Sequence, residues 1–121
     1  MHRLFLALWL LAVCGPAAAH ETLTPEQWEA RAGGASLLID VRTPQEFATG
    51  HLAHAVNLPL DQLAAHLAEL PRDKPLVLYC RSGRRAKAAL QLLEQHGFTQ
   101  LYEIEGSILR WQQEGRPLVS P

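Results

Sequence analysis

Two short runs of apolar residues, at positions 37–41 and 75–79, constrain the fold of this chain more than any other feature. Their apolar side chains follow one another, whereas a strand with one solvent-exposed face would alternate apolar and polar residues. Consecutive apolar residues are typical of strands that helices cover on both faces, as in parallel sheets. The sequence therefore predicts an α/β fold with a parallel central sheet and helices on both faces.

Segments with helical spacing or helix-capping residues alternate with these strands, which is the connection that parallel strands need. The predicted helices cover residues 25–31, 60–70, 84–96 and 107–114, with a further capped turn at 43–46. Weaker signals predict short strands at residues 55–58 and 100–104. No linker or repeat interrupts this alternation, so residues 20–121 are predicted to form one domain.

The first nineteen residues have the pattern of a secretory signal peptide. Arg3 precedes an apolar run at residues 4–13, and three alanines follow at residues 17–19. We expect cleavage after Ala19, export, and a periplasmic location. A retained membrane anchor is disfavoured because a glycine and a proline interrupt the run too early. Lipidation of Cys14 is the other alternative, and Val13 stands where that signal expects a small residue.

Charge and cysteine content exclude several classes of protein. The chain has 121 residues and a formal net charge of −1, which argues against a nucleic-acid-binding protein or a polybasic membrane-surface protein. One of its two cysteines, Cys14, lies in the predicted signal. Cys80 therefore has no partner for an internal disulfide after cleavage, and it remains available for chemistry.

Cys80 stands where the second apolar run meets a predicted helix, and ligands of parallel sheets bind beyond the carboxyl ends of strands. The positive end of the helix dipole and the nearby arginines favour thiolate over thiol. We therefore predict that Cys80 is a nucleophile. The alternative is a buried structural thiol, which is the usual place of a free cysteine.

The loop after Cys80 has the composition of an anion-binding cradle. Ser82 and Gly83 are short, so backbone N–H groups can approach a ligand closely. Arg81, Arg84 and Arg85 can neutralise a negatively charged substrate, and their spacing favours Arg81 and Arg85 in that role. The alternative for all three arginines is a solvated helix face.

Several short motifs occur together and in a familiar order. They are Leu38-Ile39-Asp40-Val41-Arg42, Glu46-Phe47, Gly50-His51-Leu52, Ala55-Val56-Asn57-Leu58-Pro59-Leu60, the Tyr79 to Arg85 segment, Glu105-Gly106, Trp111 and Gly115. In this combination the chain resembles the single-domain rhodanese sulfurtransferases, and among them an exported, phage-shock-type member. The resemblance implies a rhodanese-like fold.

The resemblance also implies a persulfide mechanism. Cys80 would attack the outer sulfur of thiosulfate, release sulfite, and pass the sulfur to cyanide or a thiol. No metal or organic cofactor is implied, and a periplasmic redox partner is a possible acceptor. Similar cysteine phosphatases and arsenate reductases carry five residues between cysteine and arginine, whereas four lie between Cys80 and Arg85. The shorter loop favours a sulfur-sized target over phosphate.

Asp40 and Arg42 match the family's Asp-x-Arg element, and we interpret them as supporting residues that fix the loop beside the active site. Two positions depart from the family pattern: His54 and Ser107 stand where glycines are usual. Because glycine alone adopts every backbone conformation easily, either residue is expected to alter the lip of the pocket or the conformation of its loop. We expect an effect on substrate preference and none on the class of reaction.

Other functions have weaker support. His51 and His54 could bind a metal together with Cys80, but nothing completes a recognisable ligand pattern. A copper site at His20, as the amino terminus after cleavage, is weaker still. A thioredoxin-like exchanger is disfavoured because no C-x-x-C pair is present. A persulfide carrier that works with a redox partner stays open, since it needs the same cysteine and cradle.

Overall fold

The computed structural model describes residues 20–31 and 34–121. The predicted signal peptide and Cys14 lie outside these residues. Within them, five parallel strands form one sheet in the order β1-β5-β4-β2-β3. The strands are β1 (His20–Leu23), β2 (Leu37–Asp40), β3 (Val56–Asn57), β4 (Leu76–Tyr79) and β5 (Leu101–Ile104). The prediction of a parallel α/β sheet is confirmed.

The helical elements lie close to their predicted positions. They are α1 (Pro25–Ala30), α2 (Pro44–Thr49), α3 (Leu60–Leu63), the 3-10 helix η1 (Ala64–Glu69), α4 (Arg84–Gln95) and α5 (Ser107–Gln113). In the described residues no helix is long and apolar enough to cross a membrane. Helices α1 and α2 each begin with a complete capping box and a proline in the first turn, which is the pattern that the sequence indicated.

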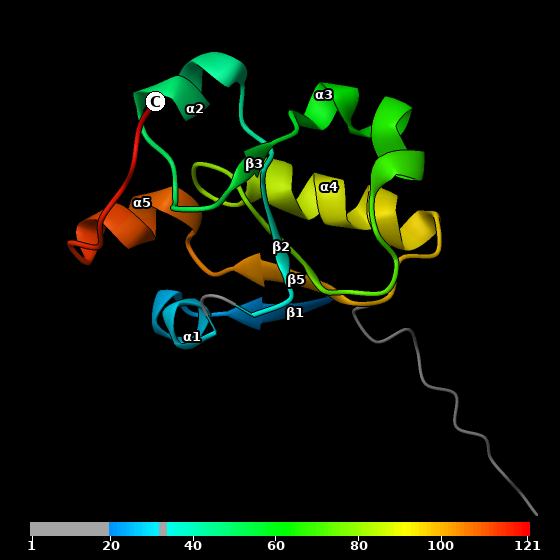
Figure 1. The fold of residues 1–121 in the computed structure, drawn as a ribbon, viewed down its shortest axis with the longest axis horizontal. Coiled ribbons are helices and arrows are strands. Elements are labelled where there is room, and N and C mark those ends of the chain that lie inside the picture. Colours follow the sequence, from blue (N-terminus) through cyan, green and yellow to red (C-terminus); the bar gives the residue numbers. More distant parts are fainter. Residues whose placement is uncertain (1–19, 32–33) are drawn as a thin grey trace, which may run out of the picture.

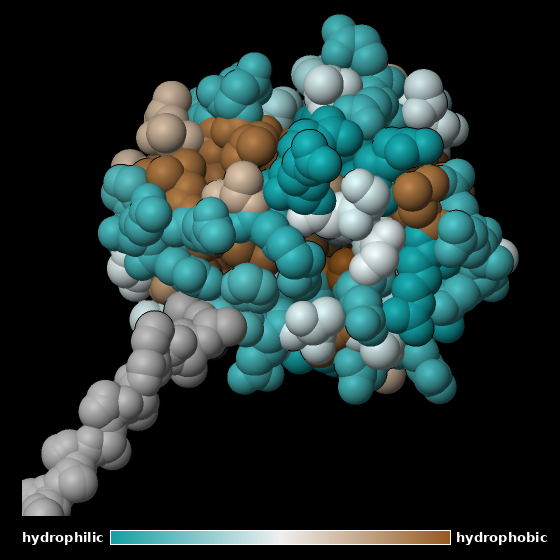
Figure 2. Space-filling model, turned by 180° about the vertical axis from the view of Figure 1, so that it is seen from behind, coloured by the Kyte–Doolittle hydropathy of each residue, from teal (hydrophilic) through white to brown (hydrophobic). Residues whose placement is uncertain are grey.

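Two apolar cores fill the space between the sheet and its helices. On one face α3 and α4 pack on strand residues such as Ile39 and Leu78, and Cys80 belongs to this core (Figure 1). On the other face α1 and α5 contribute Trp28 and Trp111 to the second core. Seen from behind, hydrophilic residues cover most of the surface, and hydrophobic residues are visible in the hollows between them (Figure 2).

Two elements differ from the sequence prediction. Strand β1 was not predicted, because it pairs only with β5 at the sheet edge and buries only Leu23 of its four residues. The predicted helix at 60–70 is divided into α3 and η1. Its last residue, Leu70, has the extended backbone that a residue before a proline prefers, so the chain leaves the helix there.

Candidate active site

Cys80 directly follows β4, at the carboxyl edge of the sheet between β2 and β5. It is a free cysteine with 1% of its surface exposed. Burial is the feature that the structural alternative for this cysteine expects, so the contacts of its sulfur decide between the two interpretations. The residue packs into the core that the strands share with α4, and its sulfur forms the floor of the loop that follows it.

Backbone N–H groups of the loop and of α4 point at this sulfur. The N–H of Gly83 donates to Sγ of Cys80 with an N to S distance of 3.0 Å, and that of Ala86 donates at 3.4 Å. Gly83 has a φ of +116°, a conformation that glycine adopts without strain and that lets the loop turn over the sulfur. Both donors and the amino-terminal end of α4 stabilise negative charge on Sγ.

Helix α5 holds Cys80 from the side of β5. The N–H of Cys80 donates to Oγ of Ser107 at 3.1 Å, and that hydroxyl lies 3.9 Å from Sγ. The N–H of Ile108 donates to the carbonyl of Cys80, and that of Leu109 to the carbonyl of Arg81, each at 3.1 Å. Ser107 is buried. Ser107 therefore contacts the cysteine of the loop itself, and its expected effect on substrate preference stays a prediction.

The three arginines of the loop have different surroundings. Arg81 and Arg84 are exposed, as is Ser82. Arg85 is half-buried, and its guanidinium makes two hydrogen bonds to Glu46, at 2.7 and 3.0 Å. These bonds lower the pKa of Glu46 to about 2. Arg85 thus already has an anionic partner. This competition could not be predicted from the sequence because Glu46 is distant along the chain.

A shallow cavity of about 360 Å³ lies beside the loop. Arg85 lines it together with Val41, Thr43, Pro59, Leu60 and Asp61. Val41 and Thr43 follow β2, Pro59 follows β3, and Leu60 and Asp61 lie in the first turn of α3. The cavity is therefore on the same edge of the sheet as Cys80. This position suits a small anion that approaches the loop, and Asp61 disfavours large negatively charged substrates.

The predicted supporting pair, Asp40 and Arg42, is buried at the end of β2. The guanidinium of Arg42 donates to the Asp40 carboxylate at 2.7 and 3.0 Å, and to the carbonyl of Gly50 at 2.7 Å. The backbone N–H of Arg42 also donates to Asp40, at 2.9 Å. The pair thereby ties the loop after β2 to the segment after α2, and neither side chain contacts Cys80 in the described structure.

The histidines considered as metal ligands have other contacts. The ring of His51 stacks on Phe47 with 3.6 Å between centroids, and His54 is exposed with a φ of +71°. The ring nitrogens of His20 lie 2.9 Å from Glu94 and 3.3 Å from Glu103. Among residues 20–31 and 34–121, no group of three histidine, cysteine, aspartate or glutamate side chains could hold a metal ion.

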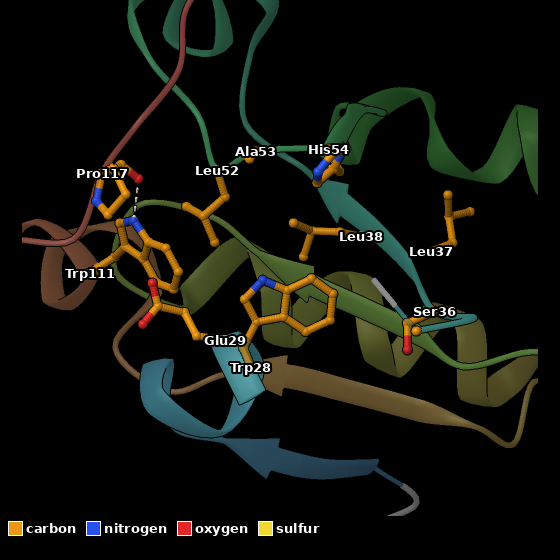
Figure 3. Close-up of a pocket in the computed structure, with 11 residues that line it drawn as sticks. Trp28, Glu29, Ser36, Leu37, Leu38, Leu52, Ala53, His54, Trp111 and Pro117 are labelled. Carbon is orange, nitrogen blue, oxygen red and sulfur yellow. Dashed lines mark hydrogen bonds between the residues drawn. The ribbon is translucent and has the colours of Figure 1, made fainter. Parts of the chain in front are cut away.

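A larger cavity, of about 430 Å³, lies on the opposite face of the sheet. Trp28 and Trp111 lie on one side of it and Leu38 and Leu52 on the other (Figure 3). The indole N–H of Trp111 donates to the carbonyl of Pro117 at 2.7 Å. No residue of the cysteine loop lines this cavity. Size alone would favour this cavity, whereas the candidate nucleophile and the N–H groups that donate to its sulfur lie at the loop on the other side.

A cysteine at the carboxyl end of a parallel strand, whose sulfur accepts N–H groups from the loop and the following helix, defines an α/β protein with a candidate cysteine nucleophile. Residues 24–114 match the model of the rhodanese-like domain. The chain belongs to this family.

Relatives and solved structures agree with this membership. A protein named Sulfurtransferase from Allochromatium vinosum is 39% identical over 85 residues, which are 70% of this chain and 79% of that protein. The uncharacterized protein YqhL of Bacillus subtilis is 42% identical over 91 residues, 75% of this chain and 71% of that protein. A crystal structure of a rhodanese-related protein from Thermoplasma volcanium has a TM-score of 0.77 at 31% identity, and the match covers 84% of this chain and 99% of that one. Together these findings support sulfurtransferase activity.

Proposed function

We propose that this protein is a thiosulfate sulfurtransferase that carries sulfur as a persulfide on Cys80. The observation that carries the proposal is the pair of backbone N–H groups, of Gly83 and Ala86, that donate to Sγ. A thiolate held in this way is ready to attack, and the same donors receive the charge when the sulfur leaves.

The proposed reaction has two balanced steps. The Cys80 thiolate attacks the outer sulfur of thiosulfate, an S–S bond forms to Sγ, and the S–S bond of thiosulfate breaks with release of sulfite. In the second step cyanide or a thiolate attacks the outer sulfur of the persulfide. The electron pair of that S–S bond returns to Sγ, which regenerates the thiolate and yields thiocyanate or a new persulfide.

The surroundings of the loop support a small anionic donor. Arg81 and Arg84 are exposed next to the cradle and can attract thiosulfate without losing an existing partner. Four residues separate Cys80 from Arg85, which is one fewer than the phosphatase and arsenate reductase loops carry. Two N–H groups at this shorter loop, of Gly83 and Ala86, already donate to Sγ, and this favours transfer of one sulfur atom over binding of phosphate.

Intact mass spectrometry tests the proposal. Fully reduced protein is incubated with thiosulfate, desalted and weighed, and then treated with cyanide. We expect a gain of one sulfur atom that requires Cys80, is absent in Cys80→Ser, and disappears as thiocyanate forms. If a demonstrably reduced Cys80 gains no sulfur, the thiosulfate reaction is wrong, and phosphate and arsenate become the substrates to test.

The burial of Cys80 favours a second candidate, a persulfide carrier that a partner protein must unload. A carrier would gain sulfur once from the donor but would keep it in the presence of cyanide, because the small acceptor could not reach the outer sulfur. Multiple turnover with thiosulfate and cyanide distinguishes the two: an enzyme releases many equivalents of thiocyanate, and a carrier releases at most one.

A further inference from the structure

Ser107 has a backbone conformation that costs a non-glycine residue free energy. Its φ is +52°, and it follows Gly106, whose φ is +78°. Two consecutive left-handed residues turn the chain sharply from β5 into α5. A serine in this conformation is strained by its Cβ atom, so glycine would be the more stable choice if backbone geometry alone mattered. The side chain of Ser107 is therefore the place to look for a compensating contact.

The hydroxyl of Ser107 has a complete and specific set of partners. Its oxygen accepts the N–H of Cys80 at 3.1 Å, which leaves the single hydroxyl proton free to donate. The acceptor within reach is Sγ of Cys80, 3.9 Å away, and no other acceptor contacts this hydroxyl in the described part of the chain. The residue is 1% exposed, so water does not compete for the proton.

Helix α5 fixes the distance between these two groups. The N–H groups of Ile108 and Leu109 donate to the carbonyls of Cys80 and Arg81. The two peptide groups that follow Cys80 are thus bonded to the first turn of α5, which also carries the hydroxyl. Sγ and the hydroxyl of Ser107 consequently stay in contact unless the whole helix moves.

We propose that Ser107 is a catalytic residue whose hydroxyl donates a third hydrogen bond to Sγ of Cys80, beside the N–H groups of Gly83 and Ala86. This inference rests on the proposed function and adds a group to its active site. The bond favours the thiolate before attack on the donor. It acts again when the persulfide S–S bond breaks and its electron pair returns to Sγ, because charge then reappears on the same atom.

Two substitutions separate the hydroxyl from the backbone strain. Ser107→Ala removes the hydroxyl and keeps the strain, whereas Ser107→Gly removes both. The fraction of Cys80 present as thiolate is measured across pH from the ultraviolet absorbance of the thiolate. The distance of 3.9 Å from Oγ of Ser107 to Sγ is long for a hydrogen bond, so its loss should have a moderate effect. We expect a roughly three- to tenfold lower ratio of thiolate to thiol at a given pH in both variants.

Thermal unfolding of the same variants supplies the control for structure. We expect a higher Tm for Ser107→Gly than for Ser107→Ala, since only glycine relieves the left-handed strain. Ser120→Ala, at an exposed position, serves as a matched serine-to-alanine control and should leave the thiolate ratio unchanged. If Ser107→Gly has the wild-type thiolate ratio, or if both variants do, the proposed hydrogen bond is wrong.

This measurement needs no sulfur donor, so it is independent of the thiosulfate experiment. If the wild-type protein gains no sulfur but both variants form less thiolate, the proposed function fails and the assignment of Ser107 stands. If the wild-type protein gains sulfur and the variants form thiolate normally, the assignment alone fails. A separate measurement is the rate of sulfur transfer from the Cys80 persulfide to cyanide, which tests whether the hydroxyl also stabilises charge on Sγ in the second step. We expect this rate to fall by the same factor in both variants.

Discussion

The helices of this protein begin in two different ways. Helices α1 and α2 start with a threonine, a proline and a capping box, and each has a glutamate in its first turn. Helices α4 and α5 start after a glycine with positive φ, and within the described residues neither has a side-chain cap nor an acidic residue in its first turn. The first pair satisfies its own N–H groups, whereas the second pair leaves them for Cys80.

Charge strengthens this contrast. The first turn of α4 carries Arg84, Arg85 and Lys87, and positive charges at this end of a helix oppose its dipole. Such an arrangement lowers helix stability unless an anion lies there. The capped helices therefore contribute stability. Of the two uncapped helices, α4 and the glycine before it direct N–H donors at the sulfur of Cys80, and α5 binds the backbone carbonyls of Cys80 and Arg81.

Gly106→Ala should cause the largest effect on stability. A methyl group at this position would overlap Cβ of Arg110, and the positive φ adds backbone strain. We expect a loss of about 3 kcal/mol in the free energy of unfolding, measured by urea titration. A loss below about 1 kcal/mol would show that α5 can begin differently, and the contrast between capped and uncapped helices would no longer hold for it.

Gly83→Ala should affect stability less and the reaction more. The added Cβ would meet only Nζ of Lys87, at 3.6 Å, so the cost is backbone strain of about 1–2 kcal/mol. Relief of that strain moves the N–H of residue 83 away from Sγ, and sulfur uptake from thiosulfate should slow by roughly tenfold or more. The rate of mass gain measures this.

A capped helix supplies the control for Gly83→Ala. Thr24→Ala removes the capping box of α1 and should cost about 1 kcal/mol. Because α1 lies on the face of the sheet away from α4, the rate of sulfur uptake should not change. Equal slowing in both variants would mean that uptake follows general stability and that the N–H donors have no special role.

Much of the fold could be predicted because its signals are local. The apolar runs at 37–41 and 75–79 and the threonine-proline pairs before α1 and α2 each specify one element. Strand β1 could not be predicted in this way. Three of its four residues are polar or partly exposed, and its strand conformation depends on pairing with β5, more than seventy residues later. The division of residues 60–70 also depends on packing.

The site was predictable to a similar degree. Cys80 and the loop after it form a contiguous motif, and the sequence placed them correctly at the end of β4. The contacts that bring in Ser107 and Glu46 join separate parts of the chain, because the bonded positions are 27 and 39 residues apart. A glycine replaced by serine was visible in the sequence, but that the serine faces Cys80 follows only from the parallel pairing of β4 and β5.

Glu46→Gln tests an ion pair that links a capped helix to an uncapped one, and it should have the smallest effect. Glu46 closes the capping box of α2 and also pairs with Arg85 of α4. The capping box of α1 uses Gln27, so glutamine at 46 should preserve the cap and remove only the ion pair. Both side chains are about one third exposed, at 30% and 33%, and solvent screening therefore limits the loss to about 0.5–1 kcal/mol at pH 7.

The pH dependence of that difference identifies its source. The pKa of Glu46 is lowered in the folded protein from 4.5 to about 2, first by its hydrogen bonds to Arg85. A carboxylate whose pKa is lowered by folding stabilises the folded state fully above its unfolded pKa, and this contribution is lost as pH falls toward the folded pKa. The stability difference between wild type and Glu46→Gln should thus be constant above about pH 5.5 and shrink between pH 4.5 and about 2. Urea titrations at pH 7 and pH 3 measure it, and an equal difference at both values would mean that the lost cap, not the ion pair, accounts for the effect.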